Sequence, residues 1–184
     1  MIIIGLDLSL NNSAFCLRKN GKLYFDKLVD TSQLEYTNII DRCALIANDL
    51  EDKLNEILTK RQKMHAVYFI ENVFIQQSKI ALQLNALGTI IRWLIFLRQG
   101  TWFNVSPQTL KSFILGKAQT KGGNKKQLML KAIYKNYQYD FDDDNTADAF
   151  ALHKFGVCYF ERKFCLTQHQ TYCIERFYKQ IMEV

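Results

Sequence analysis

The stretch MIIIGLDLSLNNSAFCLRKNGKLYFDKLV, residues 1–29, decides the fold. Residues 2–9 are apolar, rich in β-branched side chains and followed by a turn-forming NN dipeptide, which predicts a buried strand. Residues 13–18 and 22–29 predict two more strands, joined at Asn20-Gly21, the dipeptide preferred in tight hairpin turns. The chain is therefore expected to open with three antiparallel strands.

The remaining elements alternate between helices and strands. Apolar residues recur at helical spacing among charged ones from about residue 36 to 60, which predicts a long amphipathic helix over the sheet. Further strands are predicted at 66–71 and 101–105, and further helices at 77–98, 106–115, 124–137, from 142 onward, and at 171–182. This order predicts an α/β fold with a mixed five-stranded sheet flanked by helices.

Composition and charge limit the class of protein. A chain of 184 residues with 48% hydrophobic content and a single proline is most simply one ordered domain with a substantial core. A net charge of +6 and a pI near 9.0 point to an anionic partner. The most apolar stretch, around 82–97, carries Arg92 and ends beside Arg98, so we expect no membrane span.

The five cysteines form an odd set without a C-x-x-C pair, and no cleavable apolar leader precedes the first strand. We therefore expect reduced thiols in a cytosolic protein. One group of potential zinc ligands has a spacing that fits no common zinc module: Cys158, Cys165, His169 and Cys173.

The stretch DDDNTADAFAL, residues 142–152, combines a helix start with several acids. The first two aspartates are predicted to cap the helix, because Asp side chains accept hydrogen bonds from its free N–H groups. Asp148 instead precedes Leu152 at helical spacing, at the top of the apolar stripe, and Asp144 and Asn145 lie one turn earlier on the same face. Two or three oxygen ligands could converge there, although this helix alone fits an ion pair as well as a metal site.

Two further acids end apolar strands. Asp7 sits in an otherwise buried run, where an unpaired carboxylate is costly, and Glu71 ends the strand AVYFIE. A capping role for Asp7 and an ordinary strand end for Glu71 are the alternatives. If the two strands are neighbours, both acids face one pocket with Asp148 at its rim, and hard oxygen ligands of this kind suit Mg²⁺ or Mn²⁺. A pair of such ions would stabilise the entering and leaving oxygens of a phosphodiester displacement.

The chain resembles the RuvC-type Holliday junction resolvases of the RNase H-like superfamily. Four motifs carry the resemblance, in family order and over most of residues 1–155: IIGLDLSLNNSAF, FIENVF, SPQTLKSFILGKAQTKGGNKKQL and NTADAFAL. The resemblance implies an RNase H-like nuclease domain over residues 1–160. Residues 161–184 exceed the family pattern, and we expect them to form a C-terminal helical extension of the same domain. It also implies a homodimer that nicks branched DNA, above all four-way junctions, using Mg²⁺ or, as a substitute, Mn²⁺. The small size and lysine-rich composition suit a phage protein acting in the host cytoplasm.

By this resemblance, Asp7, Glu71 and Asp148 look like three of the four metal ligands of the family. The fourth normally lies three residues before the last, where this chain has Asn145 in place of an acid or a histidine. Either Asn145 ligates through its amide oxygen or Asp144 replaces it. We favour Asp144, because each lost carboxylate weakens the attraction for a divalent cation.

The resemblance also implies contacts with DNA. Phe74 matches a family aromatic that unstacks bases at the junction, where an apolar wedge stabilises opened DNA; a core phenylalanine is the alternative. The lysines expected to grip phosphates are Lys111, Lys117, Lys121, Lys125 and Lys126. One of Lys125 and Lys126 is expected to neutralise charge in the transition state, and the alternative for these lysines is a solvated basic loop.

The helix at 77–98 has more apolar surface than one sheet contact requires, and Gly88 would allow another backbone to approach closely. In the family this region lies at the dimer interface, which suits a junction with two symmetric cleavage points. A helix buried within a monomer is the alternative.

Three other functions compete with junction cleavage. One is a nuclease for RNA–DNA hybrids or structured RNA, and another is a junction-binding protein without catalysis, which Asn145 keeps open. An ATP-using actin-like or sugar-kinase fold shares the opening hairpin pattern, but it ranks last because it normally needs two such domains.

Overall fold

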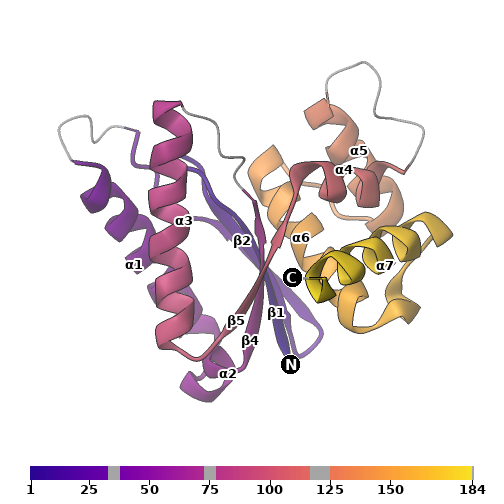
Figure 1. Ribbon diagram of the computed structural model, residues 1–184, viewed down its shortest axis with the longest axis horizontal. Helices are drawn as coiled ribbons and strands as arrows, with labels where there is room; N and C mark the ends of the chain where they lie inside the picture. The colour runs from indigo at the N-terminus through magenta and orange to yellow at the C-terminus, as the bar shows by residue number, and fades with distance from the viewer. Residues whose placement is uncertain (33–37, 73–77, 117–124, 184) are drawn as a thin grey trace.

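The computed structural model describes residues 1–32, 38–72, 78–116 and 125–183. Its centre is a five-stranded sheet in the order β3-β2-β1-β4-β5 (Figure 1). The strands are β1 (Ile2–Asp7), β2 (Ala14–Lys19), β3 (Lys22–Lys27), β4 (Ala66–Glu71) and β5 (Thr101–Val105). β1, β2 and β3 pair antiparallel, whereas β4 runs parallel to both β1 and β5. The predicted mixed sheet with three antiparallel strands first is confirmed.

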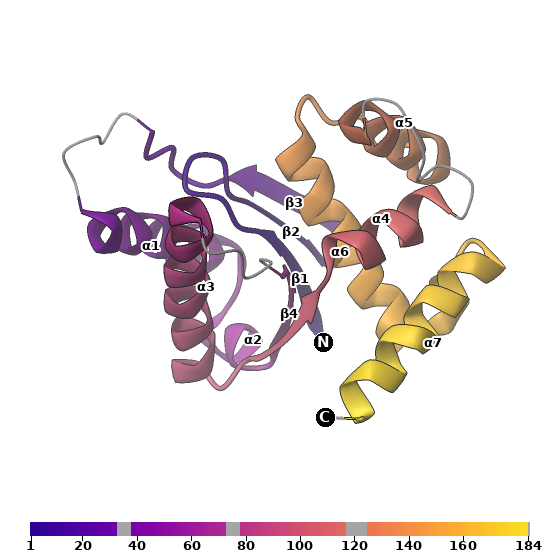
Figure 2. The ribbon, with the colours of Figure 1, turned by 45° about the horizontal axis from the view of Figure 1, so that its top comes forward.

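Helices cover both faces of this sheet (Figure 2). α1 (Ile39–Ile57) and α3 (Lys79–Leu97) lie on one face, and α6 (Asp144–Phe160) lies on the other. The remaining helices are α2 (Lys60–Met64), α4 (Pro107–Leu115), α5 (Lys125–Tyr137) and α7 (Gln168–Met182), with a short 3-10 helix at Arg162–Phe164. α4, α5 and α7 all pack against α6, so α6 is the centre of its layer.

The alternation of side chains along β1 gives each face of the sheet its own core. Ile4 and Leu6 point to the side of α1 and α3, where they join a buried cluster with Leu50. Ile3 points the other way and packs in a second cluster with Phe69 of β4 and Phe155 of α6. The odd-numbered residues of β1 therefore face α6.

The hairpin between β2 and β3 turns at Asn20 and Gly21, as predicted. Their φ angles are 51° and 79°, and Lys19 pairs directly with Lys22 across the turn. Positive φ at both central residues gives the twist that a two-residue hairpin needs, which asparagine tolerates and glycine adopts without strain.

α6 lies very close to the sheet, because β1 and α6 each place a glycine at their contact. A Cβ atom on Gly5 would lie 2.1 Å from the carbonyl oxygen of Ala149 and 2.4 Å from the backbone nitrogen of His153. A Cβ atom on Gly156 would lie 2.5 Å from a ring carbon of Phe69. Real Cβ contacts are essentially never shorter than 3.0 Å, so both positions need glycine.

His153 ties α6 to β1 by a hydrogen bond. Its Nδ1 lies 3.0 Å from the carbonyl oxygen of Ile3, and since that oxygen can only accept, Nδ1 is the donor. Burial lowers the pKa of His153 to about 4, although the hydrogen bond to Ile3 opposes the shift. The imidazole is therefore neutral near pH 7, and its bond fixes the position of α6 along β1.

Two helix boundaries differ from the predicted ones. α1 ends at Ile57 rather than near residue 60, because Thr59 starts α2 with a reciprocal capping box to Gln62. α7 begins at Gln168 rather than at residue 171, because the Thr167 side chain accepts a hydrogen bond from the backbone N–H of Gln170. Apolar spacing alone does not reveal either cap.

α3 corrects two expectations. By length and composition alone it could cross a membrane, so Arg92 does not exclude a span; helices in protein cores pass the same test, and Leu87 and Ile91 are buried against the sheet. The space beside Gly88 is occupied from within its own helix. The Arg92 guanidinium of the same helix fills that space, 2.5 Å from where a Cβ would lie.

Gly5→Ala is expected to destabilise the fold by about 1–3 kcal/mol, because the added methyl group must push α6 away from β1. The free energy of unfolding in urea measures this loss. Gly88→Ala is the matched control, since its closest contact is the flexible end of Arg92 and alanine favours a helix interior. An unfolding free energy of Gly5→Ala equal to that of the wild type would contradict the close seating of α6.

Candidate metal centre

Asp7 and Glu71 lie side by side at the ends of two neighbouring parallel strands. β1 and β4 pair in a register that runs to Leu6 opposite Ile70, and each acid is the last residue of its strand. Both side chains take the direction of Gly5, which is the face covered by α6. The condition for the two acids to face one pocket, that their strands are neighbours, is met, and neither acid is an ordinary exposed strand end.

The Asp7 and Glu71 carboxyl groups hydrogen bond to each other. Burial raises the pKa of Asp7 well above its usual value, and the negative charges of Glu71, Asp148 and Asp144 raise it further. Burial also raises the pKa of Glu71, while the positive charge of Lys111 and the hydrogen bond from Asp7 act in the opposite direction. A hydrogen bond between two carboxyl groups needs one proton, and in this bond Asp7 is the donor and Glu71 the acceptor.

The start of α6 brings two more acids toward this pair. Asp144 and Asp148 lie one helical turn apart, are half-buried and raise the pKa of Asp7 by their charge. Asn145 is also half-buried and contributes no charge. The structure thus gathers four carboxyl groups from β1, β4 and α6 within electrostatic range of one another.

Asp143 is the cap of α6. Its Oδ1 accepts a hydrogen bond of 3.0 Å from the Thr146 backbone N–H, and its Oδ2 accepts one of 2.8 Å from the Thr146 hydroxyl. Lys27 of β3 lies 3.3 Å from the same carboxylate. Of the two aspartates expected to cap the helix, Asp143 does so and the exposed Asp142 does not. The cap fixes where α6 begins, and hence where Asp144 lies.

Among the described residues, no group of three or more His, Cys, Asp or Glu side chains is arranged closely enough to hold a metal ion. The Cys158, Cys165, His169 and Cys173 group is included in this result, so it gains no support as a zinc site. For the carboxylates, the donor chemistry still suits Mg²⁺. That ion keeps several waters and needs only one or two protein carboxylates, and the mutual repulsion of four acids favours a divalent cation among them.

The structure places one of the predicted lysines at this centre. Lys111 of α4 is half-buried, and its positive charge lowers the pKa of Glu71. Lys125 and Lys126 begin α5, but their side chains lie outside the described part of the chain. Three predicted DNA contacts also lie outside the described residues: Phe74, Lys117 and Lys121.

Sequence reasoning missed the residues that position the acids. Gly5 allows α6 to approach β1, and His153 anchors the same helix five residues beyond Asp148. A glycine inside a strand pattern is a known signal of close backbone approach, so Gly5 could have been noticed. A histidine on a buried helix face carries no comparable signal, because its partner is a backbone oxygen 150 residues away.

Comparisons with known proteins bear on the fold. No protein-family model matches the chain, and no curated protein sequence matches it. Two solved structures match over nearly the whole length of both chains, each with a TM-score of 0.59. One is T. thermophilus RuvC in complex with Holliday junction substrate, at 12% identity, covering 98% of this chain and 96% of that one. The other is Thermus thermophilus RuvC, at 14% identity with the same coverage. The chain therefore has the RNase H-like fold of RuvC.

Proposed function

We propose that this protein is a metal-dependent endonuclease that resolves four-way DNA junctions by symmetric nicking. The observation that carries the proposal is the proton-sharing Asp7–Glu71 pair at the ends of β1 and β4, with Asp144 and Asp148 beside it. Such a concentration of buried acid costs stability and is typical of a functional site. The fold supports the same conclusion, since a structural neighbour is RuvC bound to a Holliday junction.

In this proposal Asp7, Glu71 and Asp148 hold Mg²⁺, or Mn²⁺ as a substitute, with Asp144 or Asn145 as the fourth ligand. When bound, the ion supplies an activated water and offsets the charge of the scissile phosphate. The shared proton of Asp7 and Glu71 has to leave before both can bind as carboxylates, so metal binding releases a proton. Lys111, and Lys125 or Lys126, add positive charge where the phosphate approaches.

A homodimer would present two such centres to one junction. The outward side of α3 carries large exposed apolar side chains, of which Trp93 and Phe96 are 58% and 59% exposed and stack with ring centroids 5.6 Å apart. Ile40 and Leu45 of the neighbouring α1 are also exposed. Exposed apolar side chains such as the Trp93–Phe96 pair favour association, and a twofold pair suits two symmetric cuts.

A junction-binding protein without catalysis is the second candidate. Asn145 favours it, because an uncharged residue stands where the resemblance places an acid or a histidine. The two candidates differ in one outcome, which is nicking of a junction in the presence of Mg²⁺ or Mn²⁺.

Asp7→Asn is expected to reduce junction cleavage by about a hundredfold or more, because a metal ligand is lost. The measurement compares a labelled four-way junction with a linear duplex of matching sequence, in Mg²⁺, Mn²⁺ and EDTA. Asp142→Asn is the matched control, since Asp142 is exposed and carries the same charge. Metal-dependent nicking by Asp7→Asn at the wild-type rate would contradict the role of Asp7.

The same variant is expected to be more stable than the wild type in EDTA at neutral pH. The pKa of Asp7 is raised in the folded state, so its contribution to stability is full at acid pH and is lost as the pH rises through that pKa. Asparagine has no such proton to lose. Thermal midpoints across the pH range test this, and a midpoint of Asp7→Asn that falls with pH as in the wild type would count against it.

Asp144→Asn and Asn145→Ala distinguish the two candidates for the fourth ligand. If Asp144 is the ligand, Asp144→Asn weakens Mg²⁺ activation of cleavage by about 10–100-fold and Asn145→Ala changes it little. Cleavage rates over a Mg²⁺ titration give both values. The opposite order would assign the position to Asn145.

Trp93→Glu is expected to shift the protein toward monomers, because a charge in an apolar interface has to be desolvated. Sedimentation equilibrium measures the oligomeric state of the variant and of the wild type. Phe164→Glu is the control, since Phe164 is an exposed aromatic outside α3. Equal association of both variants and the wild type would remove α3 from the interface.

A further inference from the structure

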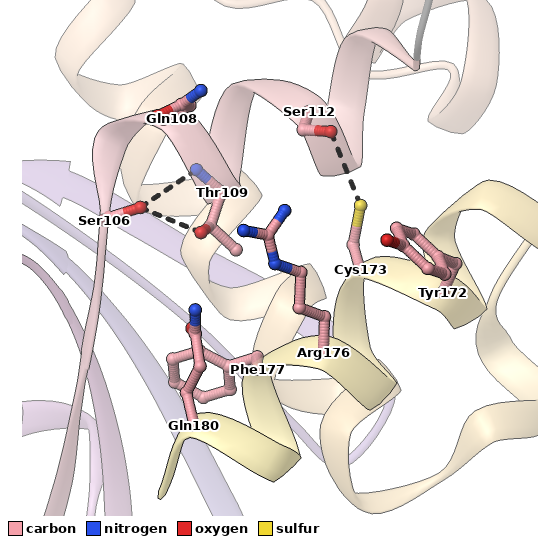
Figure 3. A pocket seen from close by; sticks show the side chains of 9 residues that line it. All are labelled: Ser106, Gln108, Thr109, Ser112, Tyr172, Cys173, Arg176, Phe177 and Gln180. Atoms are coloured by element: carbon pink, nitrogen blue, oxygen red, sulfur yellow. Dashed lines mark hydrogen bonds between the residues drawn. The ribbon is translucent and has the colours of Figure 1, made fainter.

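A separate cavity of about 300 Å³ lies between α4 and α7, away from the carboxylates. We call it the α4–α7 pocket. Its lining includes Ser106 at the N-cap of α4, Thr109 and Ser112 of α4, and Tyr172, Arg176 and Phe177 of α7 (Figure 3). Its α7 side belongs to residues 161–184, the expected C-terminal extension of the domain.

The charge of the pocket is positive. Arg176 is the charged residue of the lining, which contains no Asp or Glu. Figure 3 shows its side chain reaching from α7 toward α4, between Thr109 and Cys173. Within the described parts of the chain, Arg176 forms no ion pair with a carboxylate. Arg176 is exposed, as Lys179 is, and what distinguishes it is its place in the lining of the pocket. A guanidinium there without an acidic partner suits an anion, because its planar fork matches phosphate oxygens.

α4 supplies hydroxyl groups on the opposite wall. Ser106 and Thr109 hydrogen bond to each other at 2.8 Å, and Ser112 lies 3.0 Å from Nε2 of His169. A hydroxyl oxygen has two acceptor sites and one donor hydrogen, so these contacts leave hydrogen-bonding capacity on atoms that border the cavity. The first turn of α4 also carries the positive end of the helix dipole, which favours an anionic ligand as well.

The rest of the lining is aromatic and amide. Phe177 is buried in the core cluster beneath the pocket, and Tyr172 stands at the rim. Gln108 and Gln180 add amide groups. Aromatic side chains, amides and a cation in one lining are the groups that recognise the base and the phosphate of a nucleotide. At about 300 Å³ the cavity is at the small end of ligand sites, which fits one nucleotide rather than a longer segment.

α4 connects the pocket to the candidate metal centre along the chain. Glu71 pairs with Val105 in the β4–β5 register, and Ser106 follows directly as the start of α4. The positive charge of Lys111 on this helix lowers the pKa of Glu71, while the adjacent Ser112 borders the pocket. A nucleotide in the pocket would therefore lie on the far side of the helix that faces the acids.

We propose that the α4–α7 pocket binds a nucleoside phosphate, with Arg176 as the phosphate ligand. The ligand is either a free nucleotide or an unpaired nucleotide of a nucleic acid strand, and both offer the same chemistry. The strand form rests on the proposed nuclease function; the free form does not.

The test measures binding to the metal-free full chain in EDTA, so that it does not depend on cleavage. Calorimetry is used with 5′-dAMP and with deoxyadenosine, and fluorescence anisotropy with a labelled single-stranded oligonucleotide. We expect Arg176→Gln to weaken binding of at least one phosphate-bearing probe by about tenfold. Lys179→Gln, which removes the same charge from an exposed position of α7 outside the pocket, should change it by about twofold or less.

The three probes distinguish a free nucleotide from a nucleotide within a strand. Arg176-dependent binding of 5′-dAMP identifies a free nucleotide, and Arg176-dependent binding of the oligonucleotide alone identifies a strand. Thr109→Leu, which fills the cavity from α4 without changing its charge, should weaken binding of the same probe. Equal affinities of Arg176→Gln and Lys179→Gln for every probe would overturn the proposal, as would deoxyadenosine binding as tightly as 5′-dAMP. An absence of junction cleavage would overturn the nuclease function and leave these binding results intact.

Discussion

The contact between β1 and α6 is the constraint on which the rest of the structure depends. Gly5 lets the backbone of α6 approach to a distance that no side chain would permit, and the His153 hydrogen bond to Ile3 fixes the helix along the strand. Because Asp148 lies five residues before His153 on the same rigid helix, this contact also sets its distance from Asp7. The packing of α6 on β1 thus forms the core on this face of the sheet and also positions the acids of the candidate metal centre.

That arrangement works against a large electrostatic cost. Asp7 is 7% exposed and has three other carboxylates around it, so its ionised form is disfavoured by burial and by repulsion. The fold tolerates the cluster by sharing a proton between Asp7 and Glu71 and by placing Lys111 near Glu71. Close packing of α6 supplies the stabilisation that keeps the acids together. A fold stabilised only by these acids would open to solvate them.

Much of this could be predicted from the sequence, because local patterns and one topological rule determine it. The hairpin at Asn20-Gly21 follows from turn chemistry, and the meeting of Asp7 with Glu71 follows from two strands that end in acids. The long-range contacts could not be predicted. His153 bonds to a backbone oxygen, which no side-chain pattern records, and Gly88 makes room for Arg92 of its own helix rather than for a partner.

α4 connects the two candidate sites and gives them a common mechanical element. It begins two residues after Val105, where the β4–β5 pairing ends, so its first turn is held by the sheet at the position of Glu71. Its far side packs on α7, where Ser112 contacts both His169 and Cys173. A short helix held at both sides cannot tilt toward α7 without moving Lys111 relative to Glu71. The position of Lys111 beside Glu71 therefore depends on how α4 packs against α7.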